Sequence, residues 1–170
     1  MDVSLKTAAR HCAVTQQPFR PGDRRVCLLV RGAGGELERW DVLPDAANQA
    51  APLGEVLCRW THVVRDPGEA SQQRRQLLQG TEDLFLALCG EPELLAGLED
   101  DEMPISEAGE EERATLKYLL ALQLERKRVL RAQEDGHYWH IRRKRAYPVE
   151  PIDLQPERIA AVQGQLALLV

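Results

Sequence analysis

The stretch Leu116-Lys117-Tyr118-Leu119-Leu120-Ala121-Leu122-Gln123-Leu124 decides the fold that we expect for this chain. Seven of its nine residues are apolar and none is Gly, Pro or β-branched, so it favours an α-helix. At 3.6 residues per turn, its apolar side chains fall on two nearly opposite faces. A helix that is apolar on two sides must be covered on two sides. We therefore predict that residues 106–134 form the central helix of the core.

The charges near this helix are strongly segregated. Ser106 is expected to cap the N-terminus, where acidic residues suit the helix dipole. Residues 76–112 contain twelve acids and no Lys or Arg, whereas residues 113–145 contain ten bases and three acids. Charge blocks in small domains usually solvate the surface or pair with each other. We favour that interpretation over a functional role.

Residues 1–66 are predicted to form a small antiparallel, β-rich N-terminal lobe. Residues 24–31 have a continuous apolar middle, and residues 36–43 follow them after a Gly-rich connection at 32–35, which indicates a β-hairpin. Residues 55–64 form a third good strand, which Asp66-Pro67-Gly68 stops.

The rest of the chain is predicted to be mainly helical. Residues 67–104 contain short helices, with Gly80 breaking one and Gly90 ending the next, and then an acidic connector. Residues 105–170 contain the central helix, one β-hairpin at 137–149 and an amphipathic closing helix that starts near Pro156. The expected fold class is α+β: a β-rich N-terminal lobe and a helical C-terminal lobe with one β-hairpin.

The composition is that of a globular protein. The chain has 170 residues, of which 44% are apolar and 29% charged, enough for one domain or two lobes sharing one core. No apolar run reaches the ~20 residues of a membrane span, and the N-terminus lacks the apolar segment of a signal peptide. We therefore expect a cytoplasmic protein that binds no membrane. Its four cysteines are interpreted as buried thiols.

Residues 12–23 resemble the first knuckle of small zinc-ribbon and LIM-like modules. Those modules carry C-x-x-C, but Thr15 occupies the second ligand position here and cannot replace a thiolate. The other candidate ligands lack paired spacing: His11, Cys27, Cys58, His62 and Cys89. We expect no metal and no cofactor. We interpret residues 1–66 as a metal-free relative of a zinc ribbon. Zinc binding by His11 and Cys12 is the weakest of the alternatives.

The whole chain also resembles uncharacterised bacterial proteins. These combine a C-A-V-T-like N-terminal turn, here residues 12–15, with a later Leu-rich helix that ends in L-E-R-K-R-V-L, here residues 124–130. The resemblance implies a common scaffold and brings no known activity.

Residues 137–147 are the best functional candidate, because basic and aromatic side chains alternate there. Charges for phosphates and rings for bases are what single-stranded nucleic acid needs. Strand alternation places Trp139 and Ile141 on one face and Tyr138 on the other. In the alternative interpretation, Trp139 and Ile141 enter the core while the arginines pair with the acidic connector at 99–102. We favour this second interpretation over nucleic-acid binding, because the net charge of the chain is −5 and nucleic-acid binders are usually basic. The candidate residues are Tyr138, Trp139, Arg142, Arg143, Lys144 and Arg145.

Catalytic motifs are absent from the sequence. It contains no G-x-S-x-G, H-E-x-x-H, Walker A or G-x-G-x-x-G pattern, and no small-molecule site is evident. We predict a non-enzymatic protein–protein interaction module with a protein partner. The alternative is an RNA or single-stranded DNA binder that uses the basic aromatic hairpin.

Overall fold

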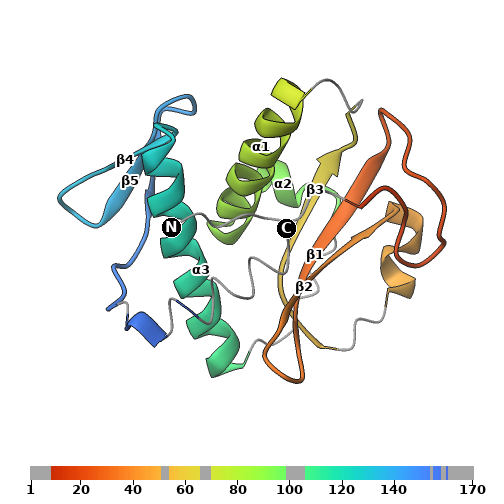
Figure 1. The fold of residues 1–170 in the computed structure, drawn as a ribbon, viewed down its shortest axis with the longest axis horizontal. Helices are drawn as coiled ribbons and strands as arrows, with labels where there is room; N and C mark the ends of the chain where they lie inside the picture. The colour runs from red at the N-terminus through yellow and green to blue at the C-terminus, as the bar shows by residue number, and fades with distance from the viewer. Residues whose placement is uncertain are drawn as a thin grey trace.

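The computed structural model describes residues 9–50, 54–65, 70–98, 106–153, 155–157 and 160. This described part contains two three-stranded antiparallel sheets with helices between them (Figure 1), so the α+β class is confirmed. The strands are β1 (Arg24–Gly32), β2 (Leu37–Val42), β3 (Gly54–Val63), β4 (Leu130–Ala132), β5 (His137–His140) and β6 (Arg145–Pro148). The helices are η1 (Pro44–Gln49, a 3-10 helix), α1 (Ala70–Leu88), α2 (Pro92–Leu95) and α3 (Glu107–Arg126).

The first sheet has the strand order β2-β1-β3 and confirms the three strands predicted for the N-terminal lobe. Central strand β1 is buried on both faces, as its continuous apolar run predicts. Cys27 and Leu29 point toward the helices, whereas Val26, Leu28 and Val30 belong to a second core on the far face. The N-terminal turn covers part of that far face with Cys12 and Phe19.

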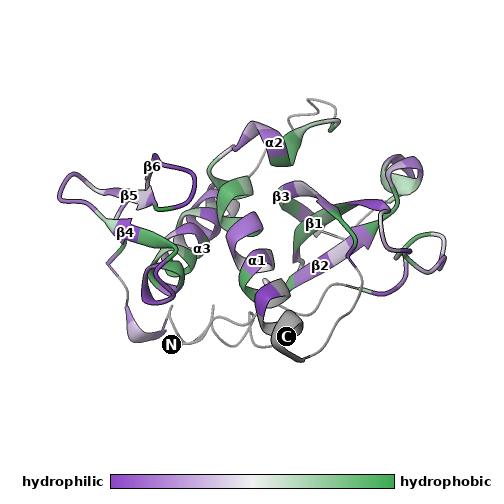
Figure 2. Cartoon of the chain, turned by 90° about the horizontal axis from the view of Figure 1, so that it is seen from above, coloured by the Kyte–Doolittle hydropathy of each residue, from purple (hydrophilic) through white to green (hydrophobic). Residues whose placement is uncertain are grey.

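The second sheet, called the small sheet below, has the order β4-β5-β6. Seen from above, α1 and α3 lie between the two sheets (Figure 2). One continuous core contains Trp60 from β3, Phe85 from α1, Leu120 from α3 and Tyr147 from β6. The N-terminal strands and the C-terminal hairpin therefore both contribute to this core, which is separate from the second core on the far face of β1. Among the described residues, no helix combines the length and the hydropathy that crossing a bilayer would require.

Helix α1 differs from the prediction, which broke it at Gly80. It continues without interruption from Ala70 to Leu88. Gly in a helix interior costs about 1 kcal/mol relative to Ala. Burial offsets this cost, because every residue from Thr81 to Leu88 is buried. This half of α1 is covered on all sides, so it shares the central position that the sequence assigned to the later helix alone.

Helix α3 starts as predicted, with the Ser106 hydroxyl accepting a hydrogen bond of 3.1 Å from the N–H of Gly109. The prediction that it extends to residue 134 is wrong. It ends at Arg126, and Arg128 follows with a φ of 59°. The chain then turns into β4, where Leu130 is buried as part of the small sheet. The apolar residues that extended the helical pattern therefore belong to a strand.

The predicted hairpin is confirmed as β5 and β6, joined by a turn at 141–144. Its second strand lies at a sheet edge, as Pro148 indicated. The third strand, β4, was not predicted. The proposed closing helix shows helical backbone at Pro156 and Glu157, but its apolar positions Ile159, Val162, Leu166 and Leu169 lie outside the described residues.

Candidate functional site

Strand β5 divides the candidate residues between two faces. Tyr138 and His140 are buried and face the core, whereas Trp139 is half-buried and lies opposite Arg131 of β4 on the outer face, the side turned away from the helices. Ile141, in the turn, is 42% exposed. The interpretation that Trp139 and Ile141 enter the core is therefore wrong. The register explains this, because Tyr138 pairs with buried Tyr147 of β6 and both rings must share the inner face.

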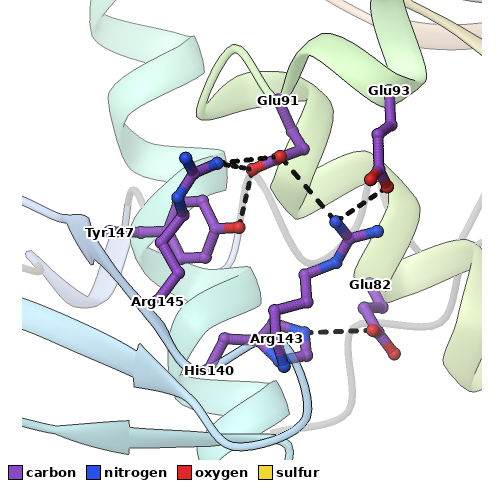
Figure 3. Close-up of polar contacts among 7 residues, drawn as sticks. All are labelled: Glu82, Glu91, Glu93, His140, Arg143, Arg145 and Tyr147. Atoms are coloured by element: carbon purple, nitrogen blue, oxygen red, sulfur yellow. Dashed lines mark hydrogen bonds and ion pairs between the residues drawn. The ribbon is translucent and has the colours of Figure 1, made fainter.

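His140 connects the small sheet to α1 (Figure 3). Its side chain is fully buried, and Nε2 lies 3.0 Å from Oε1 of Glu82. The backbone N–H of Arg143 donates to Nδ1 over 3.2 Å, so Nδ1 carries no proton and Nε2 is the donor to Glu82. Burial, aided by the charges of Arg143 and Arg142, lowers the pKa of His140 although Glu82 favours the charged form. His140 is thus a neutral, fixed tautomer.

The turn arginines pair with acids of α1 and α2. Arg142 binds Glu82, whose side chain is only 8% exposed. Nη1 of Arg143 lies 3.0 Å from Glu93 and 3.8 Å from Glu91. A buried carboxylate needs such partners, because an unpaired charge in the interior is strongly destabilising. These arginines therefore hold the hairpin against the helices.

Glu91 is the centre of the cluster, and the end of α1 places it there. Gly90 has a φ of 75°, in the left-handed region. The N–H of Gly90 donates to the carbonyl of Ala87, and the N–H of Glu91 donates to the carbonyl of Leu86. These two bonds form a Schellman motif. The predicted end of the helix at Gly90 is confirmed. The motif turns Glu91 toward the small sheet, with its side chain 6% exposed.

Two hairpin side chains meet at the Glu91 carboxylate. The hydroxyl of Tyr147 donates to Oε2 over 2.7 Å, and Nη1 of Arg145 lies 3.0 and 3.2 Å from the two oxygens. Burial and this hydrogen bond raise the pKa of Tyr147 to about 12. Burial alone would raise the pKa of Glu91, but Tyr147 and Arg145 hold it below its ordinary value. The cluster is therefore an ionised carboxylate with a neutral phenol.

The predicted residues thus have different environments. Tyr138 is in the core, and Arg142, Arg143 and Arg145 are ion-paired on the side of the helices. Lys144 is exposed in the turn, and Trp139 faces outward. The acids at 99–102, which the sequence suggested as partners, lie outside the described residues. The partners that are seen are Glu82, Glu91 and Glu93, all from the same acid-rich stretch.

Sequence reasoning missed these three glutamates and Arg131. Neither Glu82, which precedes Asp83, nor Glu91, which precedes Pro92, belongs to a sequence motif that indicates a site. The segregation of acids at 76–112 and bases at 113–145 predicted that ion pairs would form between the two stretches. It did not predict which acid would pair with which base.

A second polar cluster lies within the first sheet. Asp41 is 1% exposed; its Oδ1 lies 2.9 Å from Nε of Arg39 and its Oδ2 lies 3.7 Å from Nη1 of Arg25. Burial opposes ionisation, but Arg39 and Arg25 hold the pKa of Asp41 below its ordinary value. Burial and the charge of Asp41 raise the pKa of neighbouring Cys27, so this thiol stays protonated. The cluster has the character of a structural charge network.

In the zinc-ribbon-like turn, the Cys12 thiol accepts backbone hydrogen bonds. The backbone N–H groups of Leu43 and Thr15 donate to Sγ of Cys12 at 3.3 and 3.5 Å. Burial raises the pKa of this thiol, but these donors hold it below its ordinary value. Within the described part, no three His, Cys, Asp or Glu side chains gather as a metal site would require. Cys12 there lacks the companions that zinc needs.

Comparison with known proteins adds no function to this geometry. No family model, curated protein or solved structure matches the sequence. The functional argument therefore depends on the chemistry of the surface itself.

Proposed function

We propose that the protein is a non-enzymatic, cytoplasmic protein–protein interaction module whose partner binds the outer face of the small sheet. The observation that supports this most is the apolar surface of Trp139 and Ile141, which are half-buried and 42% exposed. In the described part, Ile141 and Val63 are the exposed large apolar residues. Trp and Arg are both enriched among the residues that contribute most to binding at protein interfaces, and Trp139 lies directly opposite Arg131.

The inner side of the small sheet prepares this face for binding. His140, Arg142, Arg143 and Arg145 are all fixed to carboxylates of α1 and α2. A surface that is already rigid loses less conformational entropy when a partner binds. The ion pairs thus serve binding indirectly, by fixing the strand that carries Trp139.

The titratable groups of the cluster favour a structural role over catalysis. Both ring nitrogens of His140 are occupied, and the pKa of Tyr147 is raised to about 12, far above the neutral range where a general base works best. The side chains of Glu82 and Glu91 are 8% and 6% exposed. A substrate would therefore reach none of these groups without opening the fold.

The nucleic-acid alternative loses most of its predicted residues. Tyr138 is buried, and three of the four basic candidates are already paired with acids. Binding of single strands depends on several stacked rings along a basic groove. Trp139 is the one predicted ring on the outer face.

Affinity capture from an extract of the source cells tests the proposal. We would immobilise the wild type, Trp139→Thr and the matched control Val63→Thr, which also removes an exposed apolar residue from a strand. Each arm is run with and without nuclease and read by quantitative mass spectrometry. Thr keeps a β-branched side chain, so the strands should be retained.

The expected result is a protein that survives nuclease and is captured by the wild type and Val63→Thr but not by Trp139→Thr. Equal capture by Trp139→Thr would contradict the assignment of the face. Capture that disappears with nuclease in every arm would favour RNA or single-stranded DNA instead.

A further inference from the structure

Four basic residues lie in or next to the two turns at one end of the small sheet, and we call them the basic end: Lys127, Arg128, Arg131 and Lys144. All four are exposed. Unlike the hairpin arginines, none of them forms an ion pair with a residue that the structure describes. Their positive charge is therefore available to an incoming group.

The backbone brings these residues together from two turns. The N–H of Ile141 donates to the carbonyl of Val129 over 3.0 Å, so the turn after α3 and the hairpin turn lie side by side. Arg128 belongs to the first turn and Lys144 to the second. Arg131 lies on the adjacent strand, opposite Trp139. The basic end therefore lies next to the aromatic side chain of Trp139.

Both turns hold a basic residue in the left-handed region. Arg128 has a φ of 59° and Lys144 a φ of 52°, where Gly or Asn would be less strained. Strained non-Gly residues persist where the surrounding structure over-determines them, and they cluster at ligand-binding positions. The two strained positions carry cationic side chains at the same end of one sheet.

Basic and acidic residues lie at opposite ends of the small sheet. Three acids near these residues already have partners: Glu82 and Glu91 pair with the arginines on the opposite side, and Oε1 of Glu125 accepts a hydrogen bond of 3.4 Å from the N–H of Ala132. Glu134 and Asp135 lie in the turn between β4 and β5, at the far end of the small sheet. Along the small sheet, the turns at one end thus carry basic residues, Arg131 and Trp139 lie between, and the turn at the other end carries acids.

We propose that the basic end binds an acidic, extended segment of a protein partner, with an apolar residue of that segment against Trp139 and Ile141. This inference rests on the proposed function and names the chemistry of its partner. Complementary charges set the orientation and the association rate, while the aromatic contact supplies apolar burial. An acidic peptide fits better than a nucleic acid because the described outer face offers one half-buried indole, while Tyr138 and Tyr147 face the core.

The test uses the full chain and defined probes. Fluorescence anisotropy would measure binding of a labelled peptide of Asp, Glu and Leu, the same peptide with Asn and Gln for its acids, and oligo(dT) and oligo(rU). The variant is Arg131→Glu combined with Lys144→Glu. Arg20→Glu is the matched control, because Arg20 is an exposed arginine in the N-terminal turn. Thermal unfolding verifies that each variant is folded.

We expect the acidic peptide to bind the wild type and Arg20→Glu, more weakly as salt rises, and to bind the charge-reversed variant about tenfold more weakly or worse. Equal binding of the acidic and neutral peptides would overturn the inference. If a protein partner is still captured through Trp139 in that case, the proposed function stands. Tighter binding of an oligonucleotide than of the acidic peptide, lost on charge reversal, would overturn the acidic segment as the ligand.

Discussion

The Nε2 of His140 lies 3.0 Å from Oε1 of Glu82, although the two residues are 58 positions apart in the sequence. The imidazole is fully buried and the carboxylate nearly so. This contact joins the hairpin to the buried C-terminal half of α1, and the hydrophobic core around that half contains residues of both sheets. The position of the outer face that carries Trp139 therefore depends on a neutral histidine.

Acid should weaken this contact. The folded protein holds the pKa of His140 below its ordinary value of 6.5, so the unfolded chain binds the proton first as the pH falls. The stabilisation is full above pH 6.5 and is lost progressively below it. We expect the urea midpoint to fall between neutral and mildly acidic pH, and to fall less in His140→Gln, which keeps a donor and an acceptor.

His137→Gln is the matched control for that experiment. His137 is on the same strand but on the other face, where it contacts Asp135. Its variant should keep the wild-type pH dependence. A pH dependence in His140→Gln as steep as in the wild type would assign the acid sensitivity to other groups.

Glu91→Gln should destabilise the protein and change one tyrosine. The neutral amide removes the buried charge to which Tyr147 and Arg145 donate, and a hydrogen bond to a charged group such as that from buried Tyr147 contributes about 2 kcal/mol. The pKa of Tyr147, about 12 in the wild type, should fall toward 10, since part of its rise comes from the bond to Glu91. Ultraviolet titration of tyrosinate and urea denaturation measure the two effects.

Glu93→Gln is the control, because Glu93 is 74% exposed and contacts Arg143 alone among the hairpin residues shown in Figure 3. Exposed pairs contribute about 0.5 kcal/mol. A loss of stability equal to that of Glu91→Gln would show that burial does not distinguish the two sites.

The strands of the first sheet could be predicted from sequence because their pattern is local. Residues 24–31 have an uninterrupted apolar middle and are closed by Gly, and β1 confirms them almost to the residue. The end of α3 could not be predicted, since Val129 and Leu130 continue its apolar spacing. What ends the helix is the left-handed Arg128, and arginine gives no signal of such a turn.

The candidate site could be predicted only in part. Segregated charges indicated pairing, but strand periodicity alone could not say which face of β5 enters the core. That choice depends on Tyr147 and Leu130, which pair across the small sheet with Tyr138 and His140. Burial of Glu82 beside Leu84 and Phe85 could not be foreseen either, because its partner His140 is distant in the sequence.

Gly80 offers a direct test of the continuous α1 helix. A methyl group added there meets no atom within 4 Å, so Gly80→Ala should stabilise the protein by about 0.5–1 kcal/mol. Gly90→Ala should do the opposite, by about 1 kcal/mol or more, because its φ of 75° strains any residue with a Cβ. Urea denaturation of both variants measures the pair. Destabilisation by Gly80→Ala would favour the break that the sequence suggested.

Asp41→Asn should be among the most destabilising single changes in the first sheet. The amide leaves Arg39 and Arg25 buried beside no carboxylate, and such losses cost about 3–5 kcal/mol. Glu38→Gln, on the same strand, is the control, since Glu38 is exposed and its glutamine can still accept the bond from Trp40 Nε1. If the two variants unfold at the same urea concentration, the Arg25–Asp41–Arg39 network contributes little to stability. A selective loss in Asp41→Asn would establish that this buried network holds β1 and β2 together.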